Sequence, residues 1–358
     1  RICPVDEGEL ESRFARADET WKTRAWRKQA AAWEDDKRTA IESHLALQRV
    51  DRTALDDAAL IEHLRAVDAH VGRMIVQHHT YNMAALIPTG DLLAHVARWT
   101  DGAVSHAEVL ALLAGTSSVS ADLRSPDAQR LARSIAGSDA AKRQLRLDDR
   151  HDDDPDTHPS DVEAAQALEA LCRLDEDAGR HASAFLELRE YRLSEGLDPA
   201  APTLREMPAV LWRAVRDCAR FAPEAEQSDP GDPALLARCR DAIPAEHRET
   251  FDGLLDEARA TYHLRDERAL YSDVWAWGIL RAACLEVGTR LLRRAEPRVI
   301  EPADALQASV AELASLLLEG DGPSIQELQR RGCLLYTSPS PRDIEVHLVC
   351  RLLREKGG

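Results

Sequence analysis

Residues 244–294 decide the fold, and they read PAEHRETFDGLLDEARATYHLRDERALYSDVWAWGILRAACLEVGTRLLRR. Their large apolar side chains recur every three or four residues, the spacing that places them on one face of an α-helix. They are Phe251, Leu254, Leu255, Ala258 and Tyr262, followed by Trp277, Leu280, Cys284, Val287 and Leu291. The pattern predicts one long helix or a hairpin of two helices.

The composition of the whole chain favours the same secondary structure. Of its 358 residues 44% are hydrophobic, with many Ala and Leu, and only 4% are aromatic. Ala, Leu, Glu, Arg and Lys are good helix formers. No stretch alternates apolar and polar residues as a strand would, and no strand-turn-helix repeat of a nucleotide-binding α/β domain is found. We expect an all-α fold, a multi-helix array in two lobes with long helices and no substantial sheet.

Polar residues and prolines mark several expected helix ends. Two Ser/Glu pairs have the spacing of a capping box, in which each side chain bonds the other residue's backbone N–H. They are Ser105 with Glu108, and Ser160 with Glu163. Pro208 suits the first turn of a helix. An apolar stripe that begins after Asp56 is expected to stop at Pro88 and Gly90.

The expected domain boundary is the segment 148–159, which reads DDRHDDDPDTHP and predicts an acidic exposed loop. It separates an N-terminal helical lobe, residues 1–147, from a C-terminal helical lobe, residues 160–332. Residues 333–358 change character abruptly. Their start, CLLYTSPSPRD, resembles the translation of a sequencing adapter, so we expect a non-native or disordered tail there.

Charge and cysteine usage narrow the expected partners. The net charge of −17 repels a phosphate backbone, which argues against nucleic acid. No apolar run approaches the roughly 20 residues that span a bilayer, so no membrane partner is expected. The seven cysteines include no C-x-x-C pair, which favours a reducing, cytoplasmic location. The chain begins with Arg1 and shows no signal peptide, and we expect its start to be truncated.

Two segments carry a family resemblance. Residues 185–208, FLELREYRLSEGLDPAAPTLREMP, resemble a helix end that reads Gly-His-Arg, followed by an Asp and a Pro-Thr-x-x-Glu-x-Pro turn. Residues 263–312 contain further matching pieces in the expected order. These are Leu264-Arg265-Asp266-Glu267-Arg268, Leu280-Arg281, Leu285-Glu286-x-Gly288 and Pro302-x-Asp304. Together the segments are similar to the central helical region of phosphoenolpyruvate-utilising phosphotransferases, the family that includes rifampicin phosphotransferase and phosphoenolpyruvate synthase.

The resemblance implies a function that needs domains outside this chain. In the family, ATP phosphorylates a histidine on a mobile domain, which then delivers the phosphoryl group to an acceptor. This region lies between the ATP-grasp domain and the phosphohistidine domain. The chain would therefore be an acceptor-binding central domain, a fragment of an ATP-dependent dikinase-type phosphotransferase. ATP and Mg²⁺ would act in the full-length enzyme, with no cofactor in this chain. The partners would be a small-molecule acceptor, aromatic ones included, and the two missing domains.

The matching pieces depart from the family at the acceptor site. Glu190-Tyr191-Arg192 stands where Gly-His-Arg is usual, which leaves the acceptor open. Two other functions remain as alternatives. One is a stand-alone helical binding or scaffold module. The other, more remote, is an isoprenoid-type Mg-dependent enzyme, because Asp148, Asp149 and Asp152 fit its D-D-x-x-D pattern.

Aromatic and cationic residues supply the candidate substrate-binding site. Flat rings and Arg side chains can line a pocket for an aromatic acceptor, although Trp at helical spacing also suits a core. The candidates are Tyr271, Trp275, Trp277, Arg265 and Arg281, together with Tyr191 and Arg192 at a helix end and the adjacent His78 and His79. The two histidines could equally be packing or surface residues. Ser105-His106 superficially matches a phosphohistidine sequence, but the cap explains it. No catalytic residue and no metal site is predicted.

Overall fold

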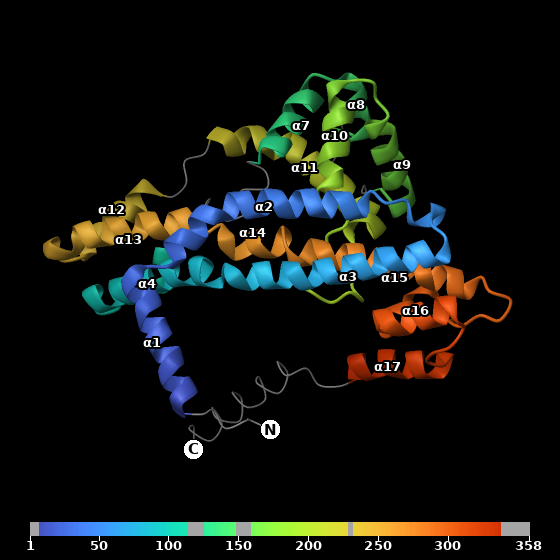
Figure 1. Cartoon of the computed structure of the whole chain (residues 1–358). Helices are drawn as coiled ribbons and strands as arrows, with labels where there is room; N and C mark the ends of the chain where they lie inside the picture. The colour runs from blue at the N-terminus through green and yellow to red at the C-terminus, as the bar shows by residue number, and fades with distance from the viewer. Residues whose placement is uncertain (1–6, 114–124, 148–158, 228–231, 338–358) are drawn as a thin grey trace, which may run out of the picture. The chain divides into compact units, whose positions relative to one another are not determined.

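The computed structural model describes residues 7–113, 125–147, 159–227 and 232–337. Every regular element in these ranges is a helix, and the one extended pairing among them is an isolated bridge between Leu193 and Thr203. This confirms the predicted all-α class (Figure 1). None of the described helices is long and apolar enough to cross a bilayer.

The elements of the first 113 residues are α1 (Glu7–Thr23), α2 (Trp26–Gln48), η1 (Arg52–Ala54), α3 (Asp57–Thr80), α4 (Asn82–Thr100) and α5 (His106–Ala111). The middle of the chain forms α7 (Pro126–Ala136), α8 (Asp139–Gln144), α9 (Asp161–Cys172), α10 (Asp177–Glu187), η3 (Leu204–Glu206) and α11 (Pro208–Gln227). The remaining elements are α12 (Pro233–Ala242), η4 (Ala245–His247), α13 (Arg248–Thr261), α14 (Leu264–Leu270), α15 (Asp273–Leu292), η5 (Pro302–Gln307), α16 (Val310–Leu318) and α17 (Ile325–Thr337).

The chain divides into two compact units that are not consecutive in sequence. Unit 1 comprises Arg1–Gln48 and Val71–Gly278, and unit 2 comprises Arg49–His70 and Ile279–Gly358. This division differs from the predicted lobes 1–147 and 160–332. The reason is that helices from both predicted lobes share apolar cores within unit 1, where α7 packs on α11 and α4 packs on α13. The predicted boundary loop lies almost wholly outside the described residues.

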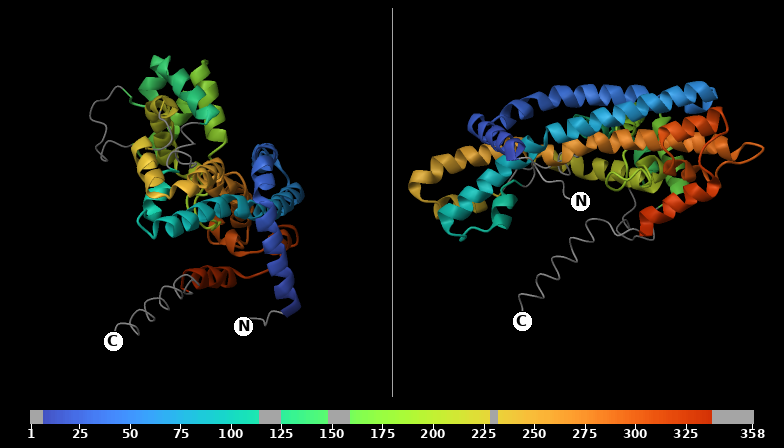
Figure 2. Two further views of the ribbon diagram at one scale, coloured as in Figure 1. Left: turned by 90° about the vertical axis from the view of Figure 1, so that its left-hand side faces the viewer. Right: turned by 60° about the horizontal axis from the view of Figure 1, so that its bottom comes forward.

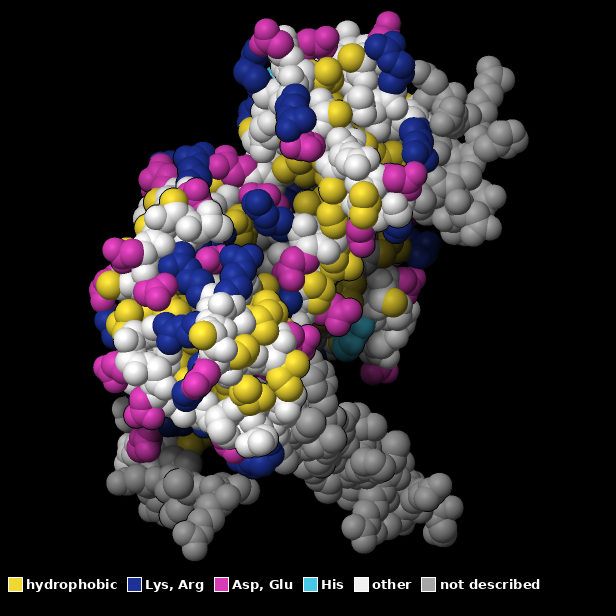
Figure 3. All heavy atoms as spheres, turned by 90° about the vertical axis from the view of Figure 1, so that its right-hand side faces the viewer, with side chains coloured by type: hydrophobic (Ala, Val, Ile, Leu, Met, Phe, Trp, Pro, Cys, Tyr) yellow, Lys and Arg dark blue, Asp and Glu magenta, His cyan; other side chains and the backbone are white. Residues whose placement is uncertain are grey.

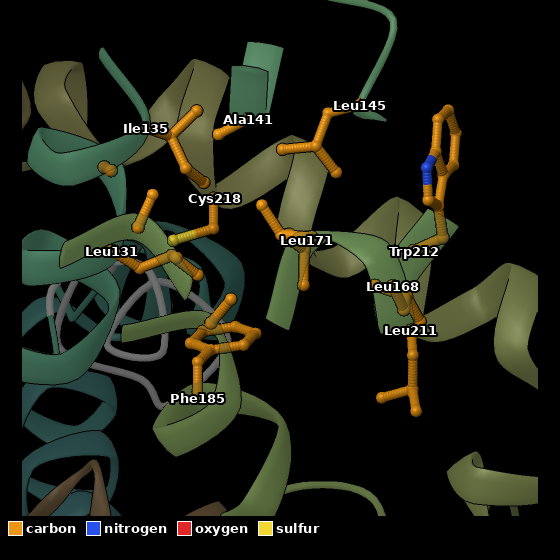
Figure 4. Packing of buried hydrophobic residues seen from close by; sticks show 14 of the residues in the cluster. Leu131, Ile135, Ala141, Leu145, Leu168, Leu171, Phe185, Leu211, Trp212 and Cys218 are labelled. Carbon is orange, nitrogen blue, oxygen red and sulfur yellow. The ribbon is translucent and has the colours of Figure 1, made fainter. Parts of the chain in front are cut away.

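Unit 1 contains an apolar cluster formed by α7 to α11, which we call the α7–α11 core (Figure 4). Its buried side chains come from these five helices and from Leu145, which directly follows α8. They include Leu131 and Ile135, Leu145, Leu168 and Leu171, Phe185, Leu211, Trp212 and Cys218. A second cluster joins α4 and α5 to α12 and α13 through Leu92, Val96, Val109, Phe251 and Leu255. Helices α4 and α13 lie side by side in Figures 1 and 2.

The predicted capping boxes are confirmed. Glu108 N donates to Ser105 Oγ at 3.3 Å, and Ser105 N donates back to Glu108 Oε2 at 2.9 Å. The Ser160 and Glu163 pair opens α9 in the same way. These bonds satisfy amide groups that the first helical turn leaves without partners.

Two predicted helix boundaries are wrong. Pro88 does not end a helix but lies inside α4, and the chain breaks earlier, at Tyr81. Proline cannot donate the i→i−4 hydrogen bond, and the packing of α4 against α13 offsets that loss. The stretch 244–294 forms α13, α14 and α15 rather than one helix or two. Asp273 helps to start α15, because its Oδ1 accepts from Val274 N at 3.0 Å.

Unit 2 is held by polar contacts as well as apolar packing. Arg290 Nη1 lies 2.9 Å from Asp57 Oδ1, and Arg290 Nη2 donates to the carbonyl oxygens of Arg52 and Leu55 at 2.8 Å each. Gly288 is required by a close approach, since a Cβ there would lie 2.2 Å from the carbonyl oxygen of Pro302. The later part of α15 therefore fixes both η1 and the start of η5.

Candidate functional site

The predicted aromatic residues Tyr271 and Trp275 lie at the junction of α14 and α15, in unit 1. Trp275 is fully buried, and its Nε1 donates to Gln48 Oε1 at 2.7 Å. The His44 ring stacks on the Trp275 ring, with centroids 4.6 Å apart, and His44 Nε2 donates to the carbonyl oxygen of Tyr271 at 3.2 Å. Helix α2 thus supplies the polar partners of this junction. A buried indole N–H needs such a partner.

Arg192 reaches the same junction from the segment that follows α10. Its guanidinium carbon lies 4.8 Å from the Tyr271 ring centroid and 5.7 Å from the Trp275 ring centroid. The residue is only 5% exposed, and its Nε and Nη2 have no hydrogen-bond partner among the described residues. A desolvated cation–π contact is worth about 2 kcal/mol, which accounts for part of the stabilisation of this buried charge. The structure therefore brings three of the nine candidate residues together, namely Arg192, Tyr271 and Trp275.

The backbone around Tyr191 packs directly on α15. A Cβ on Gly278 would lie 1.6 Å from the carbonyl oxygen of Tyr191, so only glycine permits this approach. Leu193 N donates to the carbonyl oxygen of Val274 at 3.4 Å. The Tyr191 side chain is buried, and the Arg205 guanidinium lies 5.5 Å from its ring centroid. Tyr191 therefore helps to position the segment.

A charged cluster that the sequence did not predict lies beside Tyr271. Lys37 Nζ is 2.8 Å from Glu34 Oε1 and 3.0 Å from Glu267 Oε2. Trp33 Nε1 also donates to Glu267 Oε2, at 2.8 Å. Burial lowers the pKa of Lys37, but the hydrogen bonds and charges of Glu34 and Glu267 raise it more, and the pKa lies above its ordinary value. Lys37 is therefore a cation at physiological pH.

These residues border a cavity of about 300 Å³, which we call the Lys37 pocket. Helix α2 contributes Glu34, Lys37 and Ile41, and α14 with its C-terminal end contributes Glu267, Leu270 and Tyr271. The rest of the lining is Leu188 and the start of α7, which comprises Ser125, Pro126 and Asp127. The lining mixes apolar side chains with four charged ones, so the cavity can contact both the apolar body and the polar groups of a small organic ligand.

Asp127 is the third carboxylate of the lining and has its own cationic partner. Arg189 Nη1 donates to Asp127 Oδ2 at 2.7 Å. Burial raises the pKa of the Asp127 carboxyl, but the Arg189 guanidinium lowers it more, so the pKa lies below its ordinary value. Asp127 is therefore ionised and compensated, whereas Glu34 and Glu267 share one ammonium group.

The two predicted histidines point to different environments. His78 Nδ1 lies 3.0 Å from Asp273 Oδ1, and its Nε2 contacts Arg268 Nη1. Because a guanidinium can only donate, Nε2 accepts and Nδ1 carries the proton that Asp273 accepts. His79 is exposed and contacts Asn82. Neither histidine lines the Lys37 pocket.

The other predicted residues do not line this pocket. Arg265 is exposed and contacts Tyr262 and Asp266. Trp277 is half-buried on α15, and Arg281 is buried in unit 2. Of the predicted set, only Tyr271 is a lining residue, while Arg192 stacks on its ring.

Sequence reasoning missed Glu34, Lys37, Ile41 and Glu267. One local signal existed, because Trp33 and Lys37 stand four residues apart and so share a helix face. That spacing alone also suits a solvated helix, and nothing in the sequence places α2 next to α14.

Glu34, His263 and Glu267 could in principle hold a metal ion, since one ligand atom from each lies within 4.8 Å of the others. Two carboxylates and an imidazole are a chemically suitable donor set for a transition metal. The Lys37 ammonium already lies between the Glu34 and Glu267 carboxylates, however, and a metal would have to displace it.

Two sequence features remain. Asp148, Asp149 and Asp152 lie outside the described residues. Ser105 and His106 form the start of α5, where Ser105 caps the helix. Comparisons with protein-family models, with curated protein sequences and with solved structures found no match.

Proposed function

We propose that this chain is the acceptor-binding helical domain of a cytoplasmic, ATP-dependent phosphotransferase of the phosphoenolpyruvate-utilising kind. In this proposal the Lys37 pocket receives a small hydroxyl-bearing acceptor, aromatic ones included. The ATP-grasp and phosphohistidine domains would lie in other parts of the same polypeptide and would handle ATP and Mg²⁺.

The observation that carries the proposal is the mutual packing of the family-like segments. Residues 185–208 and the start of α15 are far apart in sequence, yet the Tyr191 carbonyl lies against Gly278 and Arg192 stacks on Tyr271. In unit 2, Gly288 likewise packs against Pro302. The two family-like segments therefore contact each other within unit 1, and the matching pieces at Gly288 and Pro302 contact each other within unit 2, which supports the proposal of one shared fold.

The pocket chemistry fits an acceptor rather than a phosphate donor. A triphosphate needs a glycine-rich cradle with Lys, Arg and Mg²⁺ to offset its charge. The described lining of the Lys37 pocket offers three carboxylates and a single ammonium group. Carboxylate oxygens can accept a hydrogen bond from an acceptor hydroxyl, and Ile41, Leu188 and Leu270 can contact its apolar body. No phosphoryl-transfer step is assigned to these residues.

Ligand binding by the isolated chain tests the proposal. Phenols at millimolar concentration should raise its thermal midpoint by about 3 °C, because a ligand that binds only the folded state stabilises it. Leu188→Trp should fill the pocket and Tyr271→Ala should remove one wall, and either change should abolish the shift. Val162→Trp is the matched control, since Val162 is exposed on α9 and does not line the pocket.

Two results would contradict the proposal. One is a shift that persists in both pocket variants, and the other is the absence of any shift with phenols, aliphatic alcohols and sugars. The gene provides an independent test. An ATP-grasp sequence on the N-terminal side and a Gly-Gly-x-x-Ser-His sequence on the C-terminal side are expected for the phosphotransferase, whereas a stand-alone binding module would have neither.

A further inference from the structure

The ammonium group of Lys37 occupies a cage formed by two carboxylates and two aromatic rings. Besides its contacts with Glu34 and Glu267, Lys37 Nζ lies 5.5 Å from the Tyr271 ring centroid and 6.0 Å from the Trp33 ring centroid. Both distances are within the range of a cation–π contact. The Lys37 side chain is 18% exposed, so this charge is largely removed from water.

The cage walls are held by contacts that do not involve Lys37. Glu267 accepts from Trp33 Nε1, and the Trp33 ring packs edge-on against the Tyr81 ring with centroids 4.8 Å apart. Tyr81 in turn donates its hydroxyl to Asp36 Oδ2 at 2.5 Å. Glu267 and the Trp33 ring would therefore keep their places if the lysine moved out, which makes this side of the cage preorganised for a cation, whereas the Glu34 side chain is 66% exposed.

The lining of the pocket that adjoins the cage carries more negative than positive charges. It contains three carboxylates and one ammonium group, and Arg189 compensates only Asp127. Arg192 stacks on the Tyr271 ring but is not a lining residue. A ligand anion would face Glu34 and Glu267 with Lys37 already shared between them. A ligand cation would find the same two carboxylates complementary.

We propose that the acceptor carries a positively charged amine on an apolar, hydroxyl-bearing body. Its ammonium group replaces that of Lys37 between Glu34 and Glu267, and the flexible lysine side chain moves into solvent. The body of the ligand then lies in the 300 Å³ pocket against Ile41, Leu188 and Leu270. This inference rests on the proposed function for the role of acceptor, and it narrows the acceptor to an amine, which excludes small keto acids.

Three probes with the same phenol ring and similar length separate the effect of charge. They are tyramine, which is a cation, 4-ethylphenol, which is neutral, and 3-(4-hydroxyphenyl)propionate, which is an anion. Isothermal titration of the full chain at about pH 7 and low salt should give the tightest binding for tyramine. 4-Ethylphenol should bind about fivefold more weakly than tyramine, and the propionate about fivefold more weakly than 4-ethylphenol. A factor of about five corresponds to one modest charge interaction.

Variants of the cage give the decisive result. Lys37→Met removes the competing ammonium at nearly constant length, so tyramine should bind about fivefold more tightly while 4-ethylphenol changes little. Glu34→Gln should weaken tyramine binding by a similar factor. Lys142→Met is the matched control, because Lys142 pairs with Asp139 on α8 and does not line the pocket.

Each other outcome contradicts this inference. If the propionate binds best and Lys37→Met abolishes its binding, Lys37 is an anion anchor. If all three probes bind equally, the pocket takes phenols without regard to charge, and only the proposed function survives. If Mn²⁺ binds and His263→Ala removes that binding, the carboxylates belong to a metal site. If no probe binds to any folded variant, both the inference and the proposed function fail.

Discussion

The α7–α11 core and the Lys37 pocket region are built from helices of the same unit, but they bury different chemistry. The apolar cluster of the core consists of aliphatic and aromatic side chains and the Cys218 thiol, and its helices also bury Gln129 and Arg216. The junction beside the pocket buries His44, Gln48 and Arg192 together with Trp275. On the face shown in Figure 3, acidic and basic side chains are interspersed at the surface, where water solvates them.

The difference separates what stabilises the fold from what can bind a ligand. Apolar burial stabilises without directional demands, whereas each buried polar group needs a partner. The Gln48–Trp275 bond and the Lys37–Glu267 pair meet that need at a structural cost that an apolar core avoids. Each buried polar group of the junction therefore depends on a specific partner, unlike the side chains of the α7–α11 core.

The largest expected effect tests the core. Trp212 of α11 is 2% exposed and donates its Nε1 to the carbonyl oxygen of Gln144 at the end of α8, so Trp212→Ala should lower the free energy of unfolding by about 3–5 kcal/mol. Urea denaturation measures this change. The affinity of the folded variant for a phenol should stay within about twofold of the wild type. A parallel loss of affinity would show that core and pocket are not separable.

The next effect tests the close packing of the family-like segments. Gly278→Ala places a Cβ against the Tyr191 carbonyl, and the free energy of unfolding should fall by about 3 kcal/mol. Gly72→Ala in α3 is the control, since nothing lies within 4 Å of that Cβ. It should raise stability by about 0.5–1 kcal/mol. Equal effects at the two glycines would refute the role assigned to Gly278.

A third prediction concerns Asp127, which belongs to α7 and also lines the pocket. Asp127→Asn should cost about 1.5–3 kcal/mol of unfolding free energy at about pH 7, the usual worth of a hydrogen bond to a charged group. The folded-state pKa of Asp127 lies below its unfolded value of about 3.9. Its contribution is thus present above about pH 4 and is lost as the pH falls through the folded pKa.

Urea denaturation of both proteins between about pH 7 and pH 3 checks the sign. The difference between wild type and Asp127→Asn should be constant at the upper end and should shrink below about pH 4. A difference that grows on acidification would mean that burial, not Arg189, dominates this carboxyl.

The smallest expected effect tests the polar junction. Gln48→Leu leaves the Trp275 indole N–H buried without an acceptor and should cost about 1–3 kcal/mol. Trp275→Phe removes the donor, so in the double variant the loss of Gln48 should matter less. A double-mutant cycle by urea denaturation measures this coupling, and strictly additive effects would show that the bond contributes nothing.

Local features of the fold were readable from the sequence, and long-range ones were not. Each capping box involves two residues that are three positions apart, so spacing alone sufficed to predict both. The pairs are Ser105 with Glu108 and Ser160 with Glu163. Pro88 was misread because its tolerance inside α4 depends on packing against α13, which lies about 160 residues away. The division into lobes differed for the same reason, since each core joins distant helices.

The candidate site shows the same division. Tyr271 and Trp275 were candidates because aromatic rings can line a pocket, and Arg192 because it lies in the family-like segment; the structure places the three in contact. Glu34 and Lys37 were not predicted, because the sequence pattern of a charged helix face is the same whether that face contacts water or another helix.

By itself the sequence determined that this chain is helical and where several of its helices begin, because helix periodicity and capping are properties of neighbouring residues. Which faces meet was decided only in three dimensions. Tertiary packing set α2 beside α14 and so enclosed Lys37 with Glu267, although 230 positions separate them along the chain. That pairing depends on the complementarity of whole surfaces, which no local pattern encodes.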